Sequence, residues 1–133
     1  MTQHEFLHPQ SWKRPKGFAN GIAAEGRLVF LAGQVGWNAQ QQFESADFVA
    51  QTRQALANIV ALVAEAGGRP EHVTRLTWFV LDKREYLSRL PELGQAYRSV
   101  MGSHFPAMTL VQVAALVEDK AKVEIEATAV VPK

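Results

Sequence analysis

Two glutamates near the end of the chain are the strongest candidates for acid–base chemistry. Glu124 and Glu126 occupy alternate positions of an otherwise apolar segment, residues 123–127. An extended strand would place both carboxylates on one face, roughly 6 to 7 Å apart along the chain. If that face is covered, a carboxylate on it can orient or deprotonate a water molecule, which is the work of a general base. If the face is solvated, the pair has no chemical role, and the pattern leaves both interpretations open.

Several other chemistries find no support in the residue types. The absence of cysteine excludes disulfides, thiolate metal ligands and a cysteine nucleophile. The histidines His4, His8, His72 and His104 pair with no carboxylate at a recognised ligand spacing, so we predict no metal site. No Gly-x-Ser-x-Gly motif indicates a serine hydrolase. The segment Gly33-Gln34-Val35-Gly36 is too short for a phosphate loop, and is either a strand end or a backbone edge exposed to a ligand.

Composition predicts one domain over residues 1–133. The chain is 47% hydrophobic and 20% charged, which is typical of a globular protein with a single core. A net charge of +1, without runs of either sign, disfavours nucleic acid and anionic membranes as partners, and favours small molecules or further copies of the chain. Residues 1–17 lack the apolar core of a signal peptide, and no stretch approaches the ~20 apolar residues of a membrane span. We therefore predict a cytoplasmic protein.

The extended segments follow from alternation and turn residues. Residues 1–16 form an irregular lead-in, which we expect to become ordered only by docking. A Glu-Gly connection is expected to join residues 22–24 and 27–34 in a hairpin. Residues 108–116 and 122–131 alternate well enough to form two further strands.

Two helices are predicted from caps and apolar spacing. The first begins at a cap on Ser45 or Asp47 and ends at a glycine pair. A short turn over residues 83–87 precedes the second, which is capped near Ser88. Pro91 then falls in its first turn, where amide groups have no intrahelical partner to lose.

The resulting order, β-β-α-β-α-β-β, predicts an α/β (α+β) sheet with two helices on one face. The strand over residues 73–81 is expected to be apolar on both sides. One side carries Leu76, Trp78 and Val80, and the other carries Val73, Phe79 and Leu81. Because no further element is available to cover the second face, we predict that other copies of the chain cover it in a closed oligomer.

Several segments match a known family in their order and spacing: Ala32-Gly33-Gln34, residues 51–58, residues 73–82, Phe105-Pro106-Ala107 and residues 123–127. Together they resemble the Rid (reactive intermediate deaminase) family, also called YjgF or L-PSP endoribonuclease proteins. The resemblance implies a fold similar to trimeric chorismate mutase. It also implies a homotrimer with small-molecule clefts between subunits, and no cofactor.

The resemblance implies hydrolysis of enamines or imines to keto acids and ammonia. Glu124 corresponds to the acidic residue that assists the water, and the backbone of Gly33 would face the ligand. The family's arginine after Phe-Pro-Ala, which holds the substrate carboxylate, is replaced by Met108. Loss of the paired hydrogen bonds between this arginine and the carboxylate should weaken binding of an amino-acid-derived imine by at least about 100-fold.

Other cleft positions lose polar groups as well. Phe18 stands where the family often has tyrosine, Ala32 replaces a small hydroxyl residue, and an asparagine expected near Gly94 is missing. An arginine from elsewhere, such as Arg53 or Arg98, could restore the missing charge. The ligand-binding residues predicted on this basis are Phe18, Ala32, Gly33, Gln34, Tyr97 and Met108, with Glu124 as the catalytic residue and no metal.

Two functions remain open at this stage. One is a Rid-like deaminase acting on an imine or enamine that is uncharged or differently anchored, and so not held by a carboxylate-binding arginine. The other is a non-catalytic trimer that binds a small apolar metabolite or assists a pathway enzyme. Ribonuclease activity is disfavoured because the chain lacks a basic patch with stacking aromatics.

Overall fold

Helix α1 (Phe48–Glu65) begins and ends where the predicted caps place it. The Asp47 carboxylate accepts a hydrogen bond from the Ala50 amide at 2.9 Å, which satisfies one of the free donors of the first turn. At the other end Gly67 adopts a φ of 79°, a conformation that favours glycine. Between these ends one face of the helix is buried, with Leu56 and Ile59 fully enclosed. Local chemistry therefore predicts this element well.

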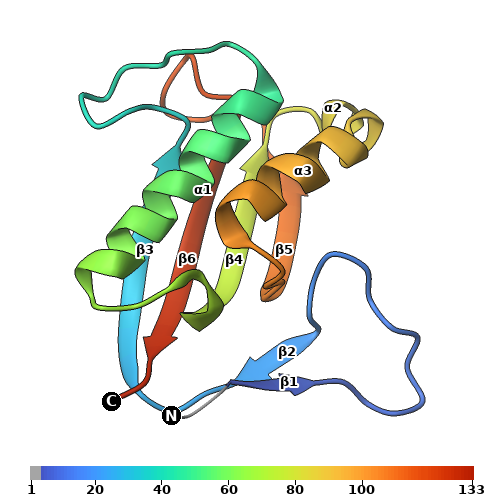
Figure 1. The fold of residues 1–133 in the computed structure, drawn as a ribbon. Helices are drawn as coiled ribbons and strands as arrows, with labels where there is room; N and C mark the ends of the chain where they lie inside the picture. The colour runs from blue at the N-terminus through green and yellow to red at the C-terminus, as the bar shows by residue number, and fades with distance from the viewer. Residues whose placement is uncertain (1–3) are drawn as a thin grey trace.

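A computed structural model describes residues 4–133 and shows helices α1 and α3 lying on one face of a four-stranded sheet (Figure 1). The sheet order is β3-β6-β4-β5, with β4 and β5 parallel and the other neighbours antiparallel. The strands are β1 (Glu5–Leu7), β2 (Gly21–Ala23), β3 (Arg27–Val35), β4 (Val73–Val80), β5 (Ala107–Gln112) and β6 (Val123–Val131). The helices are α1, the 3-10 turn η1 (Pro70–His72), α2 (Lys83–Ser88) and α3 (Leu90–Met101).

The predicted hairpin between residues 22–24 and 27–34 is wrong. Strand β2 pairs with β1 in a separate two-stranded sheet, whereas β3 pairs with β6 over most of its length. The nine-residue β6 offers β3 a much longer partner than the three-residue β2. A Cβ at Gly26 would lie 2.9 Å from the Val131 carbonyl carbon, so the chain passes tightly across the end of β6 instead of folding back. The lead-in is consequently not irregular throughout, because it supplies β1.

The segment before α3 also differs from its prediction. Residues 83–87 belong to a short helix, α2, whose start is capped by the Asp82 carboxylate. Helix α3 then begins at Leu90 with Arg89 at the cap position, and Pro91 lies in the first turn as expected. Arg89 pairs with both Asp47 and Glu92, at 2.6 and 2.7 Å. The ion pairs join the starts of α1 and α3, a long-range contact that local capping rules do not capture.

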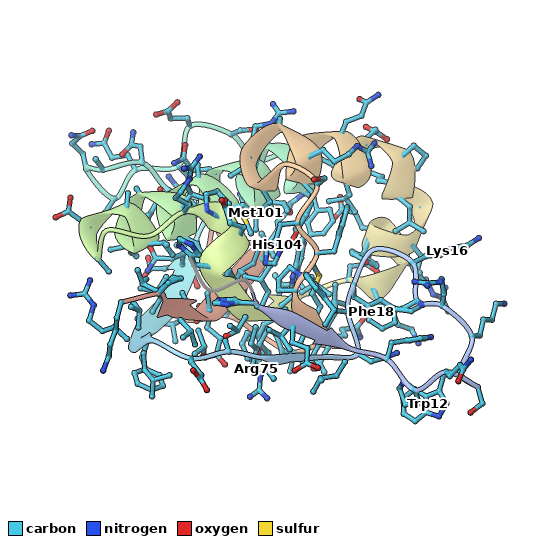
Figure 2. The ribbon with its side chains drawn as sticks, turned by 60° about the horizontal axis from the view of Figure 1, so that its bottom comes forward. Trp12, Lys16, Phe18, Arg75, Met101 and His104 are labelled. Atoms are coloured by element: carbon cyan, nitrogen blue, oxygen red, sulfur yellow. The ribbon has the colours of Figure 1, made fainter. Side chains whose placement is uncertain are left out.

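The second face of the sheet is mixed rather than apolar. A register irregularity between Val73 and Arg75 moves Val73 into the core and leaves Arg75 on the uncovered side. Figure 2 shows Arg75 projecting from the side of the sheet opposite Met101. On the same uncovered face, near the sheet edge, Leu28 and Phe30 of β3 are 61% and 75% exposed. Strand β5 ends at Gln112, four residues earlier than predicted.

None of the helices within residues 4–133 has the length and apolar character needed to span a membrane.

Candidate functional site

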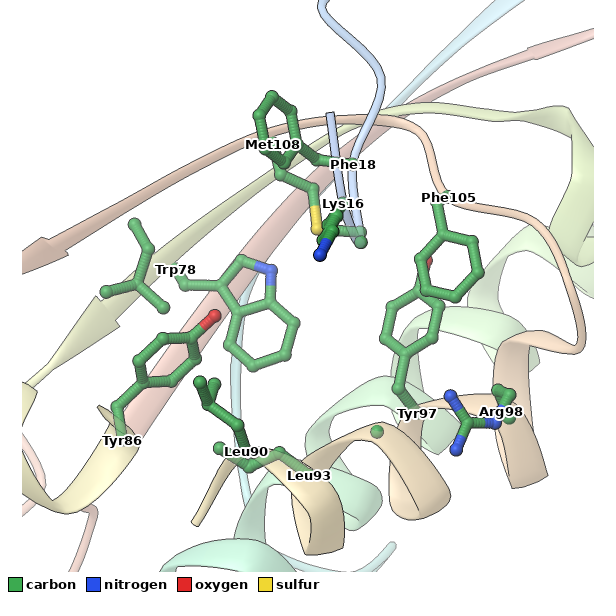
Figure 3. Close-up of a pocket in the computed structure, with 13 residues that line it drawn as sticks. Lys16, Phe18, Trp78, Tyr86, Leu90, Leu93, Tyr97, Arg98, Phe105 and Met108 are labelled. Atoms are coloured by element: carbon green, nitrogen blue, oxygen red, sulfur yellow. The ribbon is translucent and has the colours of Figure 1, made fainter. Parts of the chain in front are cut away.

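A cavity of about 450 Å³ lies between helix α3 and the β4–β5 edge of the sheet. Figure 3 shows its walls, which consist mainly of aromatic and aliphatic side chains. The aromatic residues are Phe18, Trp78, Tyr86, Tyr97 and Phe105, and the aliphatic ones are Leu90, Leu93, Met108 and Leu110. An apolar cavity of this size, with few polar groups, is typical of a small-molecule site. We call it the α3 pocket.

Tyr97 and Phe105 form one rigid wall of the α3 pocket. Their rings stack with centroids 4.9 Å apart and an interplanar angle of 13°. The Tyr97 hydroxyl donates to the His104 carbonyl at 2.6 Å, and burial raises the pKa of this phenol. Because that hydroxyl is already engaged, Tyr97 presents its ring rather than a polar group to the pocket.

The N-terminal arm, residues 4–20, brings Phe18 to the pocket. The amide of Ala19 donates to the Pro106 carbonyl at 3.0 Å, and Ala19 bridges to Ala107 at the start of β5. Phe18 therefore lies beside the Phe-Pro-Ala segment although almost ninety residues separate the two in sequence. Met108 faces the same pocket, because its β4 partner Leu76 is buried on the helix side.

A second group of predicted residues lies on β3 and β6. Glu124 is half-buried, and within residues 4–133 its carboxylate has no hydrogen-bond or ion-pair partner. The carboxylate lies against Gly33, where an added Cβ would be 2.8 Å from Glu124 Cδ and would overlap the oxygen beyond it. Only glycine at position 33 leaves the carboxylate in this place. Ala32 and Gln34 flank Gly33, and the Gln34 side chain donates to the Ala32 carbonyl at 3.0 Å.

Helix α1 holds the end of β3 that carries Gly33. Asn58 donates through Nδ2 to the carbonyls of Val35 and Trp37, at 3.2 and 2.9 Å. Gly36 packs so closely on α1 that a Cβ would lie 2.6 Å from the Gln51 Cα. These contacts give a physical reason why residues 51–58 and the Gly33 region occur together among the segments that resemble the family.

One chain does not bring the two groups together. Met108 faces the helices, whereas Glu124 pairs in register with Phe79, whose side lies away from them. Phe18, Tyr97 and Met108 therefore line the α3 pocket, while Gly33 and Glu124 belong to the β3–β6 side of the sheet. Strands β3 and β5 are the two opposite edges of the sheet. A single site containing both groups requires two copies of the chain.

The model for the endoribonuclease L-PSP family matches residues 12–131. The chain belongs to the endoribonuclease L-PSP (Rid) family. It is 34% identical over 108 residues to 2-iminobutanoate/2-iminopropanoate deaminase of Escherichia coli K12, covering 79% of this chain and 80% of that protein. A RutC family protein of Pasteurella multocida is 34% identical over 105 residues, covering 79% and 81% respectively. The crystal structure of YyfB, a Rid family protein of Yersinia pestis, superposes with a TM-score of 0.86 at 30% identity, covering 98% of this chain and 100% of that one.

As a Rid-family chain, the protein carries pocket residues that were not among the predicted ligand-binding residues. Trp78 was expected as a core residue of its strand, yet it forms part of the pocket wall. Lys16 reaches the pocket from the predicted lead-in, and Arg98 reaches it from α3 of the same chain. Arg98 was named as a possible substitute for the family arginine, but no local signal marks Lys16.

Histidines connect the arm to the core of this Rid-family fold. His4 donates through Nε2 to the His72 carbonyl at 3.3 Å, and the Phe6 ring packs edge-on against His104 at 5.9 Å. His104 donates to the Val73 carbonyl at 2.7 Å. Within residues 4–133, no three acidic or histidine side chains are grouped closely enough to hold a metal ion.

Stability should fall in mildly acidic solution because of these histidines. Burial lowers the pKa of His104 and of His72, so protons bind more readily to the unfolded chain, in which both pKa values are about 6.5. The free energy of unfolding should therefore keep its full value above about pH 6.5. It should decrease as the pH falls from about 6.5 toward the lowered pKa values of the folded protein. Urea unfolding at about pH 7.5 and about pH 5.5 measures this loss. The loss should shrink in His104→Gln and persist in the control His8→Gln, and an unchanged loss in His104→Gln would contradict the assignment.

Proposed function

We propose that this Rid-family protein is a cofactor-independent deaminase that hydrolyses a reactive imine or enamine. The observation that carries the proposal is the Glu124 carboxylate, which is half-buried, unpartnered within the described residues, and lies against the bare backbone of Gly33. A carboxylate in that state is available to accept a proton from water. The 34% sequence identity with the 2-iminobutanoate/2-iminopropanoate deaminase of Escherichia coli K12 supports the same reaction class.

The proposed chemistry is a hydrolysis that balances without a redox partner. Glu124 takes a proton from water as the water oxygen bonds to the imine carbon. That proton and the electron pair of the C=N double bond go to nitrogen, which gives a carbinolamine. The hydroxyl proton of the carbinolamine then passes to its amino group as the C–N bond breaks and the C=O bond forms. Ammonia leaves and a carbonyl compound remains.

We propose that the site forms between subunits of a cytoplasmic homotrimer. Gly33 and Glu124 of one subunit would meet the α3 pocket of its neighbour, with Ala32 and Gln34 beside them. The exposure of Leu28 and Phe30 on the uncovered face supports such an assembly, because large apolar groups at a sheet edge favour burial against another chain. Sedimentation velocity tests the trimer, and a monomer at micromolar concentration would contradict it.

A non-catalytic binding protein is the second candidate. It is favoured by the apolar lining of the α3 pocket, where Met108 replaces the family arginine, and by the position of Glu124 outside that pocket within one chain. Ribonuclease activity has weaker support, because a net charge of +1 provides little attraction for an RNA backbone.

The deciding experiment compares the wild type with Met108→Arg on a small enamine, which tautomerises to the imine that is hydrolysed. The probe is 2-aminoacrylate, generated from serine by a serine dehydratase, with keto-acid release as the readout. We expect little acceleration by the wild type, and a gain of at least about 10-fold in kcat/KM for Met108→Arg, since an arginine fork adds charge-assisted hydrogen bonds to the carboxylate.

Two results would contradict parts of this proposal. Wild-type activity equal to that of the Escherichia coli deaminase would contradict the idea that Met108 disables small carboxylate-bearing imines. Absence of hydrolysis by both proteins, for this enamine and for larger or neutral imines, would favour the binding protein.

A further inference from the structure

The indole N–H of Trp78 is a buried donor without an acceptor. The side chain is 5% exposed, and within residues 4–133 its Nε1 has no hydrogen-bond partner. A buried donor in this state costs free energy, so native proteins rarely leave one unsatisfied. Trp78 lines the α3 pocket, and Figure 3 shows its indole nitrogen turned toward the pocket interior. The missing acceptor is therefore expected from a ligand.

The ammonium group of Lys16 lies in the same part of the pocket. Figure 3 shows the Lys16 ammonium and the Trp78 nitrogen turned toward a common region next to Met108. Arg98 is the second cation of the pocket wall, on the α3 side. No aspartate or glutamate lines the pocket in the part of the chain that the structure describes. The wall that this chain supplies therefore carries two positive charges and no negative one, and next to Lys16 an anionic acceptor fits better than a neutral one.

The size and lining of the α3 pocket specify the rest of the ligand. Its volume of about 450 Å³ equals roughly fifteen water-sized groups at 30 Å³ each, far more than a pyruvate-sized molecule fills. Away from Lys16, the pocket is lined by Tyr86, Leu90 and Leu93 on one side and by the stacked Tyr97 and Phe105 on the other (Figure 3). Such walls accept an aromatic or large branched apolar group.

We propose that the α3 pocket binds carboxylic acids with an aromatic or large branched apolar body, holding the carboxylate between Lys16 Nζ and the Trp78 indole N–H. Lys16, from the arm, thus takes over the anchoring that an arginine at position 108 would provide. Together with the deaminase reaction, which rests on the proposed function, this anchor gives imino acids with bulky apolar side chains as the substrate class. The binding itself is measurable without catalysis.

Binding is tested with three probes that differ in one property each. Hydrocinnamate carries both a carboxylate and an aromatic body, hydrocinnamamide lacks the charge, and propionate lacks the ring. Calorimetry on the whole protein should detect hydrocinnamate and show at least about 10-fold weaker binding of the other two, the range expected for loss of a charge-assisted hydrogen bond or of buried aromatic area. Equal binding of the amide and the acid would overturn the proposal.

The variants assign the contacts. Lys16→Met and Trp78→Phe should each weaken hydrocinnamate at least about 10-fold, whereas Lys13→Met, on the same arm but outside the pocket, should bind as the wild type does. Since Trp78→Phe alters a buried position, the indole N–H resonance of wild-type Trp78 supplies a second measure. It should shift on adding hydrocinnamate, and an unmoved resonance or an unaffected Lys16→Met would overturn the proposal.

The same titration in Glu124→Gln separates this inference from the proposed function. Hydrocinnamate should bind this variant at least as tightly as the wild type, because a Glu124 carboxylate from a neighbouring subunit repels a bound anion and is assigned to the water, not to the carboxylate anchor. Absence of binding in the wild type refutes the carboxylate anchor whatever the activity. Normal binding without deaminase activity on any imine instead refutes the proposed function.

Discussion

Replacing Glu124 with glutamine is expected to lower the kcat of imine hydrolysis by about 100-fold or more, which is the usual contribution of a general base. Glutamine keeps the size and polarity of the side chain but cannot accept the proton of water. The substrate is the imine of phenylalanine, formed in situ by an amino-acid oxidase, and the readout is ammonia release above the spontaneous rate. KM should change little, since the carboxyl group of Glu124 acts on water rather than on substrate binding.

Glu126 provides the matched control for this prediction. It lies two residues along β6, on the same uncovered face, but not against Gly33. Glu126→Gln should retain kcat within about 2-fold of the wild type, because an exposed carboxylate away from the site contributes little to the reaction. Equal losses in both variants would show that the charge of this face, and not a specific base, supports the activity.

Gly33→Ala tests the placement of the carboxylate rather than its chemistry. The new Cβ would lie 3.0 Å from Glu124 Cγ and closer still to the carboxyl group. The end of a flexible side chain can move aside cheaply, so the fold should tolerate alanine while the base is displaced. We expect kcat to fall by at least about 10-fold with the melting temperature nearly unchanged. An unchanged kcat would indicate that Glu124 needs no fixed position.

Gln51→Leu is expected to destabilise the fold by about 3 kcal/mol, the sum of three hydrogen bonds at about 1 kcal/mol each. The Gln51 side chain belongs to a residue that is only 1% exposed. It donates to the carbonyls of Ser45 and Lys120, at 3.0 and 2.9 Å, and accepts from the Lys122 amide at 2.8 Å. Leucine has a similar volume but leaves these three partly buried backbone groups without their side-chain partner.

Urea unfolding measures this loss against a surface control. Gln95→Leu, on the exposed side of α3, should change the free energy of unfolding by less than about 0.5 kcal/mol. Because Lys122 directly precedes β6, Gln51→Leu should also lower deaminase activity by loosening the strand that carries Glu124. A stability loss under about 1 kcal/mol would show that water replaces the amide at little cost.

The two largest predictions concern one structural unit. Gln51 holds the start of β6, Gly33 leaves space for the Glu124 carboxylate, and α1 holds β3 through Asn58. All three depend on contacts between segments far apart in the chain. The sequence shows which residue types these are, but it does not show the distances between them.

Short-range interactions were sufficient to predict several elements from the amino-acid sequence. The Asp47 cap and the glycine end of α1, the position of Pro91 in the first turn of α3, and the alternation of β4 each depend on neighbours within a few residues. The matched segments likewise predicted the family, which the comparisons confirm. Residue types also identified Glu124 and Glu126 as candidate bases, and the family resemblance then singled out Glu124.

Tertiary structure decided which strands pair and what the α3 pocket contains. Strand β3 pairs with β6 rather than β2 because the longer partner forms more hydrogen bonds and buries more apolar surface, a competition between distant segments. Trp78 fits a core strand by pattern, yet the register of β4 with β5 and the placement of α3 and the arm turn its N–H into a cavity. Lys16 approaches that cavity only because the arm docks on the Phe-Pro-Ala segment. Sequence therefore determined the elements and the candidate base, whereas long-range packing determined which groups can meet a ligand.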